Sequence, residues 1–459
     1  MDIISIKRMV TFMVLNMITK YSKLITSIRH KCIDNAPLIN KFNIALFCVL
    51  IFLIRIPSLY IIPVYSPIFQ TTNISRLIIL FIFVSNYFIS NSIKLFLNRK
   101  NMSLFILILF YFFTQSISVI KVVNINNYLL TYKDLIFALL LFVISLQVIN
   151  KKNLNLFCII LIIVTFTDIT YQVTFYMFPS VIFPFLSFVF NEKYLQFFNF
   201  QYGRNRFFGD SLDEAFIPLI IWTLIKEKAF IKRILLLLLM IGVIFITFIS
   251  NWRTKIIILL FSLFVSTIMY YKYIKKYLLL LMLGVLLTIF TSSNFSLYTV
   301  KTDIIDRFLF NNEIEKKIIS NRINYWKEAI EMGLSSPITG VGLGNYYDNL
   351  PKKSKQANKI ISSNLITIDD PHNLFVSTFA STGFLGLISL TLLLGYFFIT
   401  DAGIFKKKQS ILQTFIIIFW GLFIFGLFNP WMYFSYLMPF WLIRGFIEKY
   451  KMIVHYEKN

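Results

Sequence analysis

The sequence is poor in charged residues and in the residues that build disulfide or metal sites. Only 14% of its 459 residues are charged, and it contains three Cys and three His. A typical soluble domain has about 25% charged residues, so a soluble multidomain protein and a disordered chain are both excluded. Cys32, Cys48 and Cys158 include no pair at metal-ligand spacing. The sequence therefore indicates neither a disulfide framework nor a zinc site.

What the chain has in abundance is apolar surface, with 58% hydrophobic residues, 52 Phe and 24 Tyr. A membrane-spanning helix needs about 20 mostly apolar residues. The pattern predicts an all-α, polytopic membrane protein with about 12 transmembrane helices. The sixth span is short and interrupted by Pro218. The predicted spans are 42–60, 77–96, 102–120, 134–149, 154–176, 214–225, 234–250, 256–271, 277–292, 373–400, 410–428 and 431–447.

The placement of the basic residues predicts the orientation. A net charge of +24 would indicate nucleic acid in a soluble protein, but here 26 Lys and Arg lie on one side of the spans and 8 lie in short segments on the other. An excess of Lys and Arg marks the cytoplasmic side of a membrane protein. Both termini are therefore expected in the cytoplasm, with no nucleic-acid partner.

Two segments on the extracytoplasmic side are long enough to fold over the membrane, at 177–213 and 293–372. Loops of this length in a compact protein are usually functional. The expected division of the chain is a cytoplasmic tail (1–41), nine spans including the loop 177–213 (42–292), a large extracytoplasmic loop (293–372), three spans (373–447) and a second tail (448–459).

The large loop contains an amphipathic helix. Apolar residues recur at three- and four-residue steps from 314 to 330, Gly333 follows, and Pro337 lies beyond it, as at a helix end. Arg322 lies on the apolar stripe, one turn before Trp326. A charge on a buried face needs a partner. Either it makes a cation–π contact or salt bridge, or it forms an anion site.

The segment Gly-Val-Gly-Leu-Gly-Asn at 340–345 is not a dinucleotide fingerprint. The third glycine of that pattern would fall at Asn345, and no strand precedes the segment. Gly342 and Gly344 instead indicate a tight turn that lets the backbone approach a ligand or another helix.

The loop ends with Asp-Asp-Pro-His-Asn-Leu at 369–374. Asp370 is expected as the N-cap of the next span and Pro371 as its first residue. His372 would then lie in the first turn, where the helix N-terminus favours a neutral ring able to accept a proton and offers N–H groups to an anion. His30 and His455 fall in the predicted tails. The alternative for His372 is a hydrogen bond to a lipid head group.

Several other charged residues lie within or beside the spans. Arg55 and Asp168 fall inside spans, where ionisable groups are rare and often functional, although they could pair with one another. Asp210, Asp213 and Glu214 could bind a cation, but a solvated or interfacial acid patch is the favoured interpretation.

Residues 200–400 contain a series of short motifs: Gly203-Arg204, Arg253, Asn-Arg-Ile-Asn-Tyr-Trp at 321–326, the turn at 337–345, His372-Asn373 and Ser-Thr-Gly-Phe-Leu-Gly at 381–386. Their order and spacing resemble the O-antigen ligase and polymerase superfamily of bacterial cell membranes. The chain departs from the family at two places. Trp252 replaces the family's Ser before Arg253, and Phe-Phe-Gly at 207–209 replaces Gly-Thr-Phe after Arg204. Without the resemblance, Arg253 could simply snorkel to the membrane surface.

The resemblance implies a GT-C-like inverting glycosyltransferase that uses no metal and no nucleotide sugar. Its donor would be a glycan on undecaprenyl pyrophosphate. Arg253 and Arg322 would hold the pyrophosphate, and His372 would activate the acceptor hydroxyl. This agrees with the chemistry of the residues, because Arg forks onto phosphate oxygens and neutral His is a suitable base near pH 7. The expected substrate-binding residues are Arg204, Arg206, Trp326, Asn373, Gly342 and Gly344.

The favoured function is a repeat-unit polymerase for O-antigen or capsule, with lipid-linked glycan, membrane lipid and a chain-length regulator protein as expected partners. A ligase with lipid A–core as acceptor is the close alternative. A flippase of lipid-linked sugars belongs to another class and would need midplane charges and an internal repeat, and no repeat is visible in the sequence. A non-catalytic scaffold is a further alternative.

Overall fold

The computed structural model describes residues 35–54, 71–89, 102–177, 212–249, 252–294, 313–350, 371–405, 410–429 and 434–456. Every long regular element in these ranges is a helix, which confirms the all-α prediction. Three short 3₁₀ helices are also present, η2 (Ser118–Lys121), η3 (Asp213–Phe216) and η4 (Tyr347–Asn349). The α-helices are α2 (Ala36–Ile54), α3 (Thr71–Ile89), α5 (Met102–Ile117), α6 (Ile125–Val148), α7 (Leu154–Met177), α10 (Ile217–Lys226), α11 (Phe230–Ile249), α12 (Arg253–Asn294), α14 (Glu313–Ser335), α16 (Leu374–Phe405), α17 (Ile411–Phe428) and α18 (Phe434–Tyr456).

Eight helices within the described ranges are long and apolar enough to cross a membrane, and α3 has a shorter apolar segment at Asn73–Tyr87. The prediction of a polytopic membrane protein is therefore confirmed. The eight are α2, α5 with η2, α6, α7, α11, α12, α16 and α17.

The sixth, eighth and ninth predicted spans differ in the structure. The sixth, 214–225, is divided into η3 and the ten-residue α10, because Pro218 stands in the first turn of α10, where its missing N–H is not needed. The eighth and ninth lie on one helix, since α12 continues for 42 residues through 272–276. That segment holds no Gly or Pro, so nothing in its sequence ends a helix.

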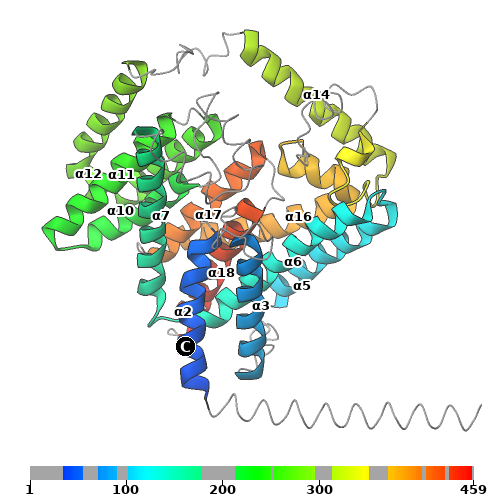
Figure 1. Ribbon diagram of the computed structural model, residues 1–459, viewed down its shortest axis with the longest axis horizontal. Helices are drawn as coiled ribbons and strands as arrows, with labels where there is room; N and C mark the ends of the chain where they lie inside the picture. Colours follow the sequence, from blue (N-terminus) through cyan, green and yellow to red (C-terminus); the bar gives the residue numbers. More distant parts are fainter. Residues whose placement is uncertain are drawn as a thin grey trace, which may run out of the picture.

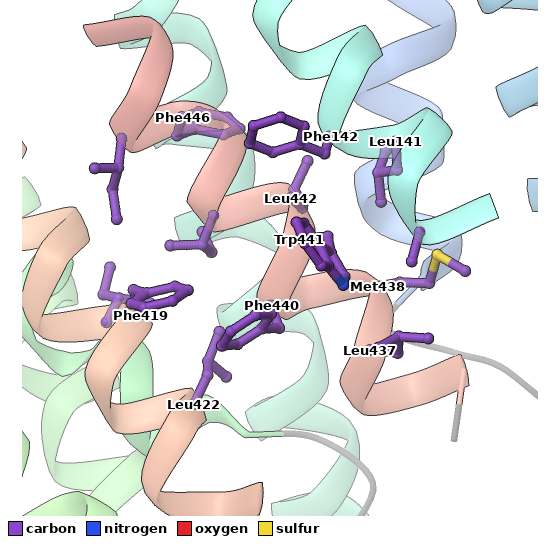
Figure 2. Packing of buried hydrophobic residues seen from close by; sticks show 14 of the residues in the cluster. Leu141, Phe142, Phe419, Leu422, Leu437, Met438, Phe440, Trp441, Leu442 and Phe446 are labelled. Carbon is purple, nitrogen blue, oxygen red and sulfur yellow. The ribbon is translucent and has the colours of Figure 1, made fainter. Parts of the chain in front are cut away.

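The central helix of the bundle is α18, which packs along α6 and α17. Trp441 is buried against Phe142 of α6, with ring centroids 5.6 Å apart. Phe440 meets Phe419 of α17 at 4.5 Å (Figure 2). The first half of α18 is apolar on all sides, as is typical of a helix enclosed by others.

The remaining helices form groups on either side of this centre (Figure 1). α10, α11 and α12 pack on one another and, through α10 and α12, on α17. On the other side α16 lies along α5, and α14 lies along α16. The arrangement brings the start of α12 and the start of α16 to the same end of α17.

A buried ionic cluster lies between the last turns of α16 and α18, and we call this end of the bundle the Arg444 end. Arg444 is fully buried and donates to Asp401 at 2.8 Å and to Glu448. Lys451 completes the cluster, 2.8 Å from Asp401 and 3.0 Å from Glu448. The Arg444 guanidinium also stacks 3.7 Å from the ring centroid of Phe397. The cluster joins α16 to α18.

The opposite end, which we call the His372 end, contains the link between α5 and α6 and the turn at 340–350. Asn345 joins them, because its amide accepts from the Asn124 N–H at 2.6 Å and donates to the Asn124 carbonyl at 3.1 Å. Asn127 donates to Asp348 at 2.8 Å. The loop that follows α14 is therefore fixed to the end of the bundle.

α16 is broken at Gly383, where the backbone has φ 66° and ψ −163°. Essentially only glycine adopts this conformation. The break interrupts the helical hydrogen bonds, and the freed N–H of Phe384 donates to the carbonyl of Pro337 at 2.7 Å. Pro337 belongs to the loop directly after α14, so this loop enters the break.

Two further hydrogen bonds hold the loop there. Val341 donates to the carbonyl of Ala380 at 2.9 Å, and Gly342 donates to that of Ser381 at 3.0 Å. Backbone groups in an apolar environment must find partners inside the protein. We call this set of contacts, between residues 337–342 and the broken turn 380–384, the interlock.

Replacing Gly383 with Ala should destabilise the protein. The added Cβ would lie 2.5 Å from backbone atoms of Ile338 and Pro337, and the positive φ costs about 1–2 kcal/mol for a residue with a side chain. Thermal unfolding of the purified protein measures the effect. Gly395→Ala is the matched control in the same helix, because a Cβ there meets nothing within 4 Å, and it should leave the melting temperature unchanged or raise it. Equal melting temperatures for the two variants would contradict the interlock.

Candidate functional site

The structure brings Arg322 and His372 into the same part of the molecule. Trp326 donates from its indole Nε1 to the carbonyl of Pro371 at 2.9 Å. Arg322 precedes Trp326 by one turn of α14, and His372 directly follows Pro371. Arg322 also stands seven residues before the buried Ala329, so it lies on the face of α14 that packs toward α16. Its side chain is half-buried.

His372 is held in an unusual backbone conformation. Its φ is +56°, which makes it the one residue other than glycine with positive φ among those the structure describes. Such conformations cost free energy and tend to occur at functional sites. The ring is half-buried, and its Nδ1 is shielded from solvent.

The predicted capping of α16 is wrong. The helix begins at Leu374, so Pro371 and His372 precede it. Asn373 is the cap, because its side-chain oxygen accepts the N–H groups of Phe375 at 3.0 Å and Val376 at 3.1 Å. An Asn side chain caps a helix as well as an Asp does, and Asp370 lies outside the described residues. His372 is therefore in the turn leading into the helix, directly before the cap.

Arg253 reaches the same end of the bundle from the other side of α17. It is the first residue of α12 and is half-buried. The preceding Trp252 packs on Phe425 of α17, with ring centroids 6.1 Å apart. Two residues further along α17, the carbonyl of Leu427 accepts from Asn373 at 3.0 Å. The end of α17 thus lies between Arg253 and His372 and contacts the neighbour of each.

The electrostatics at the start of α12 are unusual. Arg253 and Lys255 both lie in its first turn, which contains no acidic residue. The positive end of a helix dipole disfavours cations, so this turn needs counter-charge from elsewhere. η3 supplies it: Lys255 is 3.6 Å from Glu214, and both side chains are at most 2% exposed. Glu214 also accepts from Thr247 at 3.1 Å.

Asp213 and Glu214 of η3 therefore do not form the solvated or interfacial acid patch that the sequence favoured. Asp213 and Glu214 are both buried, and Asp213 accepts from Gln172 of α7 at 3.3 Å. Lys255 lies 5.7 Å from the ring centroid of Trp252. The role of Lys255 was not predicted from the sequence. The signal that could have indicated it is the pair of cations, Arg253 and Lys255, in the first turn of α12.

Gly342 and Gly344 lie against protein. A Cβ at Gly342 would stand 2.4 Å from Val122, and one at Gly344 would stand 2.4 Å from Thr131. Their φ angles are +100° and +72°, so both positions need glycine to let the turn approach the link between α5 and α6. The predicted tight turn is present, and it approaches a helix.

Five of the residues singled out in the sequence lie outside the described residues: Arg55, Gly203, Arg204, Arg206 and Asp210. Asp168 is half-buried on α7. Within the described ranges, no group of three or more His, Cys, Asp or Glu side chains is arranged to hold a metal ion.

The described helices define a polytopic membrane protein, and Arg253, Arg322 and His372 lie toward one end of its bundle. Residues 234–391 match the family model of the O-antigen ligase. The matched segment runs from α11 into α16 and includes Arg253, Arg322 and His372. The resemblance to the O-antigen ligase and polymerase superfamily is thus confirmed over this part of the chain. A comparison with curated proteins finds no match.

Replacing Glu214 with Gln should strongly destabilise the start of α12. Removing one partner of a buried ion pair leaves the other charge unpaired, at a cost of about 3–5 kcal/mol. Chemical unfolding in detergent measures the loss. Adding Lys255→Met in the same chain should recover much of it, because the uncompensated charge is then gone.

Glu227→Gln serves as the control, since Glu227 pairs at 3.8 Å with the exposed Lys232 and a Gln can still accept the backbone N–H groups of Lys228 and Ala229, so the loss should be small. An unchanged midpoint for Glu214→Gln, or further destabilisation by Lys255→Met, would show that the pair does not support the site.

Proposed function

We propose that this protein is a repeat-unit polymerase for a bacterial surface polysaccharide. It would transfer a growing glycan from undecaprenyl pyrophosphate to the non-reducing end of a lipid-linked repeat unit. The observation that carries this proposal is the common location of Arg253, Arg322 and His372 at one end of the bundle, within the segment that matches the O-antigen ligase family. The His372 end would face outward from the inner membrane, with both termini in the cytoplasm.

The two arginines would bind the pyrophosphate of the donor. Guanidinium groups are permanently charged and fork onto phosphate oxygens. The buried Glu214 pairs with Lys255 at 3.6 Å, and Arg253 is a half-buried cation of the same turn. As the bond between the anomeric carbon and the pyrophosphate oxygen breaks, negative charge accumulates on the leaving group. Fixed cations stabilise that charge without reorganisation.

His372 would act as the base. The acceptor hydroxyl oxygen forms the new bond to the anomeric carbon, and its proton passes to the imidazole. We assign Nε2 to this role because Nδ1 is shielded from solvent. Attack from the face opposite the pyrophosphate inverts the anomeric configuration. The N-terminus of α16 adds the positive end of its dipole beside the ring.

A ligase is the alternative that a specific observation favours, since the matching family carries that description. It would share the donor site and differ in the acceptor, which would be lipid A–core. A chain-length regulator would be a partner of the polymerase alone.

Arg253→Ala, Arg322→Ala and His372→Ala should each abolish long polymer and leave single repeats on the lipid carrier. Loss of a group that stabilises developing charge lowers kcat by about 10²–10³-fold. Arg322→Lys should rescue poorly, because Lys lacks the planar fork. Gel analysis of the polysaccharide, with the protein quantified in the membrane fraction, gives the readout.

Lys327→Ala is the matched control, because Lys327 is an exposed cation on the same helix. It should give normal polymer. Normal polymer from all three of the other variants would end the catalytic assignment.

Purified wild-type protein supplied with a lipid-linked repeat unit should form polymer without lipid A–core. The products can be separated by size after mild acid release. Transfer that occurs only when lipid A–core is added would favour the ligase over the polymerase. The Arg322→Ala protein, which should form no product with either acceptor, controls for contaminating activity.

A further inference from the structure

One end of the group formed by α10, α11 and α12 (Figure 1) carries many more basic than acidic residues. Between Glu214 and Asp303 the sequence contains a single acidic residue, Glu227. The basic residues near it are exposed, apart from the half-buried Arg233. We call them the basic cluster: Lys226, Lys228, Lys232, Arg233, Lys272 and Lys275.

Contacts between side chains bring the three parts of the basic cluster together. Trp222 of α10 lies against Tyr270 of α12, with ring centroids 5.9 Å apart. The Nζ atom of Lys226 is 4.9 Å from the centroid of the Trp222 ring. The link from Lys226 to the start of α11 is only three residues long, at 227–229. The end of α10, the start of α11 and the part of α12 next to Lys272 are therefore neighbours.

Glu227 is already engaged and cannot neutralise the basic cluster. Its Oε1 atom accepts the N–H groups of Lys228 and Ala229 at 3.0 Å each, so it fixes the turn before α11. Its other carboxylate oxygen is 3.8 Å from Lys232, and its backbone carbonyl accepts from Arg233 at 2.6 Å. One carboxylate leaves a surplus of positive charge, and like charges gathered in one place repel one another unless an anion joins them.

The basic cluster lies at a boundary of the membrane. One helix segment able to cross a membrane begins at Phe230, and the next one ends at Tyr273. Tyr270 is hydrogen-bonded at 2.8 Å to Thr414 in the first turn of α17. Since α17 begins shortly after α16 ends, the cluster belongs to the Arg444 end of the bundle. Lipid head groups lie at this level, where the hydrocarbon ends.

An exposed apolar strip runs from the basic cluster along α11. Ile231, Leu235 and Leu238 stand at steps of four and three residues, which places them on one face of the helix. They are 72%, 49% and 57% exposed, and Phe230 in the first turn is 75% exposed. Because α11 is long and apolar enough to cross a membrane, acyl chains cover this strip. A surface that is cationic at the boundary and apolar beside it fits a ligand with an anionic head and an acyl tail.

We infer that the basic cluster binds an anionic phospholipid of the bilayer, with the phosphate against the exposed lysines and an acyl chain along the strip on α11. Groups of Lys and Arg at the ends of spans attract anionic lipids in this way. A zwitterionic lipid would fill the apolar strip equally well but would not compensate the surplus charge. The site lies at the opposite end of α12 from Arg253, so it does not depend on the proposed sugar transfer.

The test compares two triple variants of the full chain that lose the same amount of charge. The first replaces three exposed residues of the basic cluster with Gln, at Lys228, Lys232 and Lys272. The matched control replaces three exposed lysines on other elements with Gln, at Lys121, Lys152 and Lys327. The purified proteins are titrated in uncharged detergent with phosphatidylglycerol, with phosphatidylcholine, or with soluble glycerol 3-phosphate. Melting temperature reports binding, and native mass spectrometry counts the lipids retained.

Phosphatidylglycerol should raise the melting temperature of the wild type and of the control, because a ligand that binds the folded state stabilises it. The cluster variant should need about tenfold more lipid or more for the same rise. Phosphatidylcholine and glycerol 3-phosphate should leave the wild type unchanged.

Three results would overturn the inference. An equal response of the two triple variants would mean that only the net charge of the protein matters. An equal effect of phosphatidylcholine would assign binding to the acyl chain alone. Stabilisation by glycerol 3-phosphate would indicate an ion site without a lipid. The double variant Lys228→Gln, Lys232→Gln replaces the triple one if that protein does not fold.

Discussion

The interlock is the interaction on which the rest of the His372 end depends. α16 is broken at Gly383, and the backbone groups freed by the break are bonded by the loop that follows α14. In an apolar environment an unbonded backbone group costs several kcal/mol, so the break and the loop need each other. The loop in turn holds α14 against the first part of α16. Through the hydrogen bond from Trp326 to Pro371, the interlock sets the position of Arg322 relative to His372.

A second constraint acts at the start of α12, on the other side of α17. Two cations in the first turn of a helix oppose its dipole, and the buried Glu214 offsets one of them. The start of α16 contributes the positive end of a second helix dipole. Both helix starts meet the end of α17, so positive potential gathers there from two directions, as a site for a pyrophosphate requires.

Features encoded locally in the sequence were predicted well. The amphipathic period from 314 to 330 predicted α14, and long apolar runs predicted the spans. Features that depend on tertiary contacts were not predicted. The burial of Glu214 follows from Lys255, which is remote in sequence, and the break at Gly383 follows from a loop some 40 residues earlier. The capping of α16 failed because Asp370 and Asn373 are both good caps, and only the folded chain selects between them.

The direct test of the account is an experimental structure of the purified protein with a polyprenyl pyrophosphate bound. The account predicts the pyrophosphate between the starts of α12 and α16, with its oxygens bonded to the guanidinium groups of Arg253 and Arg322 and His372 facing the carbon to be attacked. A pyrophosphate bound elsewhere, or Arg253 and Arg322 directed into separate spaces, would contradict it.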